Sequence, residues 1–323
     1  MRLFPFRRPS LGLSIGADTL GLVEVRRGWR EPSLRRCVER ALPAGLLKLS
    51  ASESNVTDVA ALATECSALL DGQGTVTRPV PISLSLPDLC ALVALLEFDT
   101  LPAKPSEVEA LIRWRLQKDL NLPVADARLT YQVFHPHVHS LPQGERAVVR
   151  VLVVAMRETV IGPYEQVCEL AGLIPVRVGL TSLQLFDLYR PTLEATRNTD
   201  EECFYLSVGE GSFMFIAFQA GVPVFLRIKP LRNGSTAGST AAVADELLAT
   251  LHFYMDREAL SERAPAFPRP LFLVHEEGIV PALPDSLDVT VVPLGWSALR
   301  IAKQPSPVPL FSSVPAFAGV MEA

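Results

Sequence analysis

Two glycine-centred turns carry the residues that could handle a phosphate group. The first is Ser14-Ile-Gly16, followed closely by Asp18, and the second is Ser207-Val-Gly209, about 190 residues later. Each turn lies between two apolar segments, as the turn of a β-hairpin does. A glycine turn lets the backbone approach phosphate oxygens and donate N–H groups to them. The repeat therefore predicts two similar halves that share the scaffold of a nucleotide site.

The side chains of these turns lack the charge that phosphoryl transfer needs. Magnesium prefers charged oxygen ligands, whereas the hydroxyls of Ser14 and Ser207 are neutral. Asp18 could compensate, although turn preference alone accounts for an aspartate there. The other candidate nucleotide-binding residues are Gly234, in a Gly/Ser/Thr-rich loop, and Gly278. We call the site degenerate because its charged residues are missing. We expect no catalytic residue and no ATP hydrolysis, and weak binding of ATP with magnesium is the alternative that stays open.

Three histidines at period two, His135, His137 and His139, could in principle project from one face of a strand toward a metal ion. Pro136 interrupts any strand there, so we interpret the segment as a solvated hairpin end and expect no metal. The five cysteines are scattered, with no Cys-x-x-Cys pair, which fits buried thiols in a reducing compartment.

Composition excludes several classes of protein. The chain has 323 residues, of which 49% are hydrophobic and 20% charged, which is typical of a well-packed globular protein of two domains. A net charge of −5 gives no electrostatic reason to expect nucleic acid as a partner. No apolar run approaches the roughly 20 residues that span a bilayer. We expect a cytoplasmic protein without a transmembrane segment.

Apolar periodicity predicts alternating strands and helices, hence an α/β fold. Strands are expected at 11–16, 20–26, 79–86, 92–98, 129–135, 147–156, 175–179, 204–218 (as a hairpin), 223–229, 271–275 and 288–292. Helices are expected at 56–70, 107–120, 160–171, from 182, at 241–256 and at 313–321.

Capping and polar residues set the predicted boundaries of one helix and of the two halves. Ser106 is expected to cap the helix at 107–120, with Glu109 as its capping-box partner. The polar stretch Glu194–Glu202 is expected to separate the halves, which gives domains at 1–197 and 198–323.

Read together, these segments resemble the PilM and MshI group of type IV pilus assembly proteins, in the actin-like superfamily that includes FtsA. The likeness covers nearly the whole chain. It rests on the opening Gly-Leu-Ser-Ile-Gly16, on the stretch Glu107–Gln132 with Arg113-Trp114, on Val151–Pro175, and on Leu206–Pro230. The departures are the two serines at the phosphate turns and His275-Glu-Glu-Gly278, where the family has Gly-Gly.

The resemblance implies an actin-like, ribonuclease H-like fold of two domains, with an extra subdomain at about 101–180 and a reduced insertion in the second domain. It implies a non-catalytic scaffold in a pilus assembly complex or a related secretion or competence machine. The scaffold would be peripheral at the inner membrane, where it would bind the cytoplasmic tail of a PilN-like bitopic protein in a channel beside the extra subdomain, and it could self-associate. By the same resemblance, the partner-binding residues would include Arg113, Trp114 and Leu116. A functional ATPase of the same fold is the rival interpretation.

Overall fold

The structure of this chain is a computed structural model. It describes residues 9–28, 31–70, 79–120, 124–135, 148–196, 202–209, 211–231, 240–259, 269–275, 281, 283–284, 287–299, 301 and 313–321.

The first large sheet contains the first glycine hairpin. Its strands are β1 (Leu11–Ile15), β2 (Thr19–Arg26), β3 (Ser33–Ala41), β4 (Val80–Leu86) and β8 (Leu173–Leu180), in the order β3-β2-β1-β4-β8. Strands β1, β2 and β3 are antiparallel, and β4 and β8 run parallel to β1. Strand β3 was not predicted from the sequence, because this edge strand carries charged residues instead of an apolar alternation.

The second large sheet repeats this arrangement. Its strands are β9 (Glu202–Gly209), β10 (Ser212–Gln219), β11 (Val222–Pro230), β12 (Arg269–His275) and β13 (Val289–Leu294), in the order β11-β10-β9-β12-β13. Again an antiparallel meander of three strands is extended by two parallel strands. The predicted repeat is therefore confirmed strand by strand. The residues described between β11 and β12 form one helix, α5 (Thr240–Ala259).

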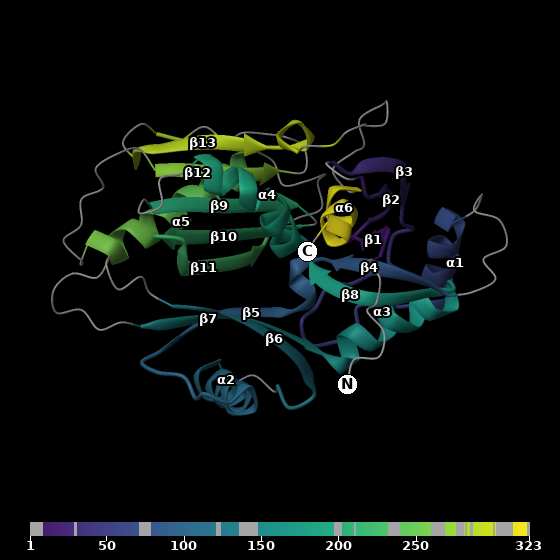
Figure 1. The fold of residues 1–323 in the computed structure, drawn as a ribbon, viewed down its shortest axis with the longest axis horizontal. Coiled ribbons are helices and arrows are strands. Elements are labelled where there is room, and N and C mark those ends of the chain that lie inside the picture. The colour runs from purple at the N-terminus through teal and green to yellow at the C-terminus, as the bar shows by residue number, and fades with distance from the viewer. Residues whose placement is uncertain are drawn as a thin grey trace.

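One helix from each half of the chain packs against the sheet of the other half. Helices α1 (Val59–Leu70) and α3 (Glu158–Leu170) cover one face of the first sheet, and α5 covers one face of the second. Helix α4 (Thr181–Thr196) follows β8 yet packs on the second sheet, whereas the C-terminal α6 (Ser313–Met321) returns to the first. Figure 1 shows α6 between the two sheets.

The predicted boundary, which assigned 198–323 to the second half, therefore needs a correction at α6. Gly12 of β1 gives the physical reason, because a Cβ there would lie 2.0 Å from the carbonyl oxygen of Ala316. Gly12 thus lets α6 pack directly against the first sheet.

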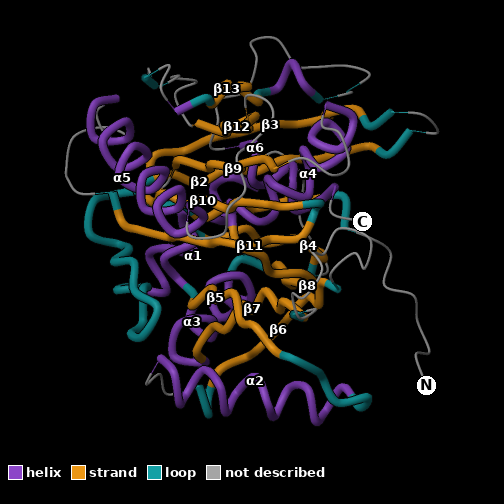
Figure 2. The backbone as a smooth tube through the Cα atoms, turned by 90° about the vertical axis from the view of Figure 1, so that its left-hand side faces the viewer, coloured by secondary structure: helices purple, strands orange, loops and turns teal. Residues whose placement is uncertain are grey.

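A third, smaller sheet lies beside β11 of the second sheet (Figures 1 and 2). It consists of β5 (Leu92–Phe98), β6 (Ala127–Phe134) and β7 (Val149–Arg157), in the antiparallel order β5-β7-β6. Helix α2 (Pro105–Leu120) covers one of its faces. The expected extra subdomain at 101–180 is thus displaced, since this unit spans 92–157 and β8 pairs with β4 in the first sheet.

Helix α2 begins two residues earlier than expected, at Pro105, and the predicted capping box is wrong. The N–H groups of Glu107 and Val108 donate to the carbonyl oxygen of Lys104. Glu109 binds Arg113 along the helix instead of reaching back to Ser106. Proline suits the first helical position, where no N–H donor is needed, and this favours the earlier start.

Within the part of the chain that the structure describes, no helix combines the length and hydropathy needed to cross a membrane.

Candidate functional site

The first glycine hairpin closes on itself. The N–H of Gly16 donates to the carbonyl oxygen of Thr19 at 2.8 Å, and Ser14 Oγ donates to that of Gly21 at 3.4 Å. Ser14 is buried, whereas Asp18 is exposed on the turn and its carbonyl oxygen accepts from Leu42 N–H at 2.7 Å. The Ser14 hydroxyl therefore stabilises the hairpin itself.

The second glycine hairpin is hydrogen-bonded to a residue of the first half. Gly211, in its turn, has a φ of +69°, a left-handed conformation that favours glycine. Ser212, which starts β10, can donate its hydroxyl proton to Gly209 O at 2.9 Å or to Asp88 Oδ2 at 3.0 Å. Asp88 belongs to the first half, in the 3₁₀ turn Asp88–Cys90 between β4 and β5. The hairpin that resembles a phosphate loop thus meets a carboxylate.

Asp88, Ser182 and Ser212 form what we call the Asp88 junction. Asp88 is 1% exposed, and its carboxylate accepts from Ser182 N–H at 3.0 Å and from Ser182 Oγ at 2.5 Å, besides Ser212. Burial raises the pKa of the Asp88 carboxyl above its ordinary value, and the donors of Ser182 and Ser212 oppose that rise. The protein itself thus supplies three donors to this carboxylate, which a metal ion would have to displace.

A hydrogen-bond chain continues from the junction into the second sheet. Tyr205 is fully buried on β9, and its hydroxyl donates to the carbonyl oxygen of Ser182 at 3.0 Å. Burial raises the pKa of the Tyr205 hydroxyl well above its ordinary value, and the Ser207 hydroxyl opposes that rise. The serine of the second turn therefore lies in the surroundings of this buried tyrosine.

The sequence-predicted nucleotide residues fall into three groups. Ser14, Gly16 and Asp18 share the first hairpin, and Ser207 and Gly209 share β9 beside the Asp88 junction. Gly234 and Gly278 lie outside the described residues. The structure tests neither nucleotide binding nor hydrolysis, so the expected absence of hydrolysis stays a prediction and weak ATP binding stays its open alternative.

An open groove of about 650 Å³ lies elsewhere, between the third sheet and the two halves. One wall is the face of the third sheet opposite α2, which presents Leu152, Val154 and Met156 of β7. The other walls are the end of β8, the length of α4, and β9 to β11. The volume is typical of ligand pockets in proteins. None of the described nucleotide candidates lines it.

The face alternation of β7 explains why this groove exists. Val151, Val153 and Ala155 pack under α2, so the intervening apolar residues must point to the other face of the sheet. A strand that is apolar on both faces is typical of a sheet covered on both sides. The run 151–156 carried this signal in the sequence, where we interpreted it only as a buried strand.

Aromatic rings and charges mark the α4 wall of the groove. The ring of Phe186 stacks on that of Phe218 at 5.1 Å, with 8° between the planes. Arg190 lies 3.6 Å from Asp187 and 4.0 Å from Glu194, and burial raises the pKa of the Asp187 carboxyl although Arg190 opposes the rise. This wall therefore combines an apolar aromatic surface with ionic groups.

The third-sheet side of the groove ends in an ionic cluster. Arg128 of β6 forms ion pairs with Glu158 and Glu165 of α3, at 2.6 Å and 2.5 Å. Glu158 and Glu165 do not line the groove themselves, so the charged residues of its lining are Arg128, Arg190, Asp187 and Glu194, two of each sign.

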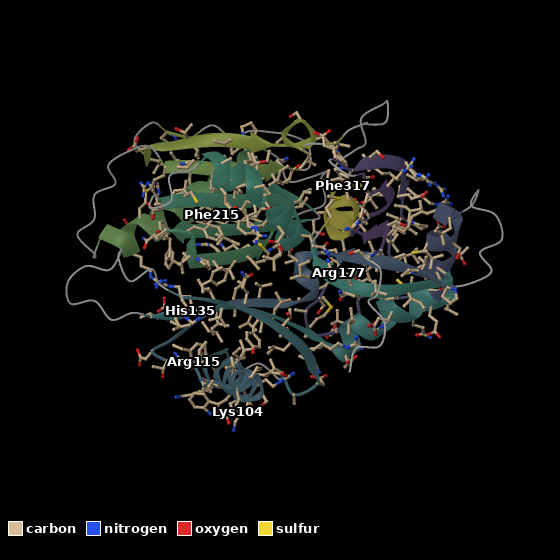
Figure 3. The ribbon with its side chains drawn as sticks, viewed as in Figure 1. Lys104, Arg115, His135, Arg177, Phe215 and Phe317 are labelled. Carbon is tan, nitrogen blue, oxygen red and sulfur yellow. The ribbon has the colours of Figure 1, made fainter. Side chains whose placement is uncertain are left out.

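The expected partner-binding residues lie on the other side of the third sheet. Leu116 of α2 is fully buried against the third sheet. Arg113 donates to the carbonyl oxygens of Val124 at 2.6 Å and Ala127 at 3.0 Å. Trp114 is 51% exposed, with the Lys118 ammonium 4.7 Å from its ring centroid. Figure 3 shows Lys104 and Arg115, which belong to the same helix region, on the outer side of the small sheet. Arg113 does not line this groove, and its expected place in a partner channel stays a prediction.

His135 follows β6 and is exposed, and His137 and His139 lie outside the described residues. The described residues contain no group of three His, Cys, Asp or Glu side chains that could hold a metal ion.

Comparison with known proteins identifies the fold. No family model matches this chain, and no curated protein matches it. A solved PilM-PilN type IV pilus biogenesis complex contains a chain that is 22% identical, with a TM-score of 0.67 over 98% of both chains.

Two other solved structures are more distant. The cytoplasmic domain of EpsL, an inner membrane component of the type II secretion system of Vibrio cholerae, is 10% identical, with a TM-score of 0.48 over 97% of this chain and 94% of that one. A protein of actin-like ATPase fold from Bacteroides thetaiotaomicron is 9% identical, with a TM-score of 0.44 over 83% and 82%. The PilM-PilN likeness and the two sheets of matching strand order establish the actin-like fold.

Proposed function

We propose that this chain is a non-catalytic actin-like scaffold of type IV pilus assembly or of a related secretion machine. In this proposal the groove receives the cytoplasmic tail of a PilN-like inner-membrane protein. The observation that carries it is the open apolar groove beside the third sheet, in a chain whose fold matches a PilM-PilN complex over 98% of its length.

The groove suits an extended peptide. Strand β6 is the outer strand of its sheet, and residues 128–132 of it line the groove in an unbroken run, so backbone as well as side chains faces the space. An extended peptide can bind along such an edge while its side chains enter apolar pockets. The two arginines and two carboxylates of the lining offer partners to charged groups of either sign on the tail.

The non-catalytic part of the proposal rests on the junction. Serines stand at both glycine turns, and the buried carboxylate nearest the second turn is bonded to the donors of Ser182 and Ser212. An ATPase of this fold would need a charged ligand for magnesium there. Under the alternative proposal, an ATPase that still binds ATP, the glycine turns would hold the phosphates by backbone contacts alone.

A tail held in the groove would keep the protein cytoplasmic and peripheral at the inner membrane, within the pilus assembly complex. Self-association is compatible with this arrangement.

An immobilised tail peptide from the candidate partner tests the proposal. It should retain the purified full-length protein, whereas the same peptide in reversed order should not. Equal retention by the two peptides, or retention by neither, would contradict it.

A further inference from the structure

Asp88 stands where three parts of the molecule meet. Its 3₁₀ turn follows β4 of the first sheet and leads directly into β5 of the third sheet. Its donors come from the first turn of α4, at Ser182, and from the start of β10 in the second sheet, at Ser212. One carboxylate therefore bonds to elements of both halves.

The same elements form the walls of the groove. Helix α4 contributes Leu183 and Gln184, which directly follow Ser182, and β10 contributes Ile216 and Phe218, on the strand that Ser212 begins. The third sheet, which Asp88 precedes in the chain, supplies the opposite wall. The relative placement of α4, β10 and the third sheet sets the width of the groove.

The bonds of Asp88 are of the strong kind for a protein interior. Hydrogen bonds to a carboxylate are stronger than those between neutral groups, and a low local dielectric increases the difference. Asp88 itself does not line the groove, so it can act on a bound peptide only through the position of the walls.

We infer that Asp88 is a positioning residue, which fixes the width of the peptide groove by bonding the second half to the first through Ser212 and Ser182. The inference rests on the proposed function for the role of the groove. The bond between the halves stands independently of it. The side chain of Asp88 connects the start of β10, beside the second glycine turn, to the first half.

The variant Ser212→Ala isolates the bond between the halves. It removes the hydroxyl that reaches Asp88 from β10 and leaves both Ser182 donors in place, so the carboxylate remains hydrogen-bonded in the first half. Ser67→Ala is a matched control, because the Ser67 hydroxyl donates within its own helix, to Ala63 O of α1 at 2.8 Å. Asp88→Asn is a second variant that keeps the shape of the side chain.

Hydrogen exchange on the full-length protein is the first readout. In Ser212→Ala, amides of residues 88–90, 181–184 and 212–216 should exchange about tenfold faster than in the wild type, because local opening of the junction becomes easier. Ser67→Ala should leave these amides unchanged. Unchanged exchange in Ser212→Ala would overturn the inference.

Affinity for the tail peptide is the second readout. Ser212→Ala should bind it about tenfold more weakly, mainly through faster dissociation, and Ser67→Ala should bind it as the wild type does. The double variant Asp88→Asn/Ser212→Ala should lose less than the sum of the single losses, because both changes break one bond. Additive losses would overturn the positioning role.

The two proposals fail in different ways. Faster exchange at the junction in Ser212→Ala, with a wild type that binds no tail peptide, would support the bond between the halves and refute the proposed function. Normal tail binding by Ser212→Ala would refute the role of Asp88 and leave the proposed function intact.

Discussion

Two regions between the sheets could hold a ligand, and they differ in what already fills them. At the Asp88 junction, serine donors from two elements meet a carboxylate that is 1% exposed. In the groove, apolar side chains of β7 and α4 line a space of about 650 Å³. The junction is closed by the protein's own groups and the groove is open. The comparison shows that this fold keeps both glycine hairpins while its open space lies beside the third sheet.

A charge on the apolar wall of the groove should produce the largest effect. Leu152→Arg places a guanidinium on the apolar groove face of β7, where it would fill the space and bring an unpaired charge against a bound tail, so tail affinity should fall by about 100-fold. Calorimetric titration with the tail peptide measures the change.

The control for Leu152→Arg is Leu170→Arg on α3, where the leucine is 60% exposed and does not line the groove. It should bind the tail as the wild type does. Equal losses in the two variants would mean that the groove is not the binding site.

A smaller effect, of predictable sign, is expected at the closed junction. Burial raises the pKa of the folded-state Asp88 carboxyl above its ordinary value of 3.8. In the pH range above 3.8 the folded protein then binds more protons than the unfolded chain, so the wild type loses stability as pH rises through that range. The variant Asp88→Asn lacks this loss. The difference in free energy of unfolding between the wild type and Asp88→Asn should therefore shrink as pH rises.

Chemical denaturation of the wild type and Asp88→Asn across this pH range measures the difference. A cost that grows with pH would show that the hydrogen bonds of the carboxylate outweigh its desolvation.

The smallest effect is expected on the far side of the third sheet. Trp114→Ala removes a ring that is 51% exposed on α2, away from the groove. Surface substitutions of this kind change stability by about 0.5 kcal/mol or less. Tail affinity should not change, and a weakened affinity in this variant would restore the α2 surface as the partner site.

The sequence predicted the repeated sheets because hydrophobic periodicity and paired glycine turns are local signals. Strand β3 was not predicted because it is an edge strand with charged residues, as in Arg35-Arg36 and Glu39-Arg40. The return of α6 to the first sheet depends on a contact between Gly12 and Ala316, which are some 300 residues apart in the chain, and no local pattern reports such a contact.

The site was predicted less well for the same reason. Ser14 and Ser207 were correctly located on the two hairpins, whereas Asp88 follows a strand in an ordinary turn and gains its role only when Ser182 and Ser212 approach it. Arg113 and Trp114 were selected by resemblance, and helix periodicity alone does not say which side of the sheet α2 covers. The groove face of β7 could have been read from its unbroken apolar run.

The most direct measurement compares the two regions in one calorimetric series on the full-length protein. The account predicts saturable heat with the tail peptide and none with millimolar ATP and magnesium, whether or not the tail is bound. Saturable heat with ATP and magnesium, and none with the tail, would contradict it and make the junction the ligand site.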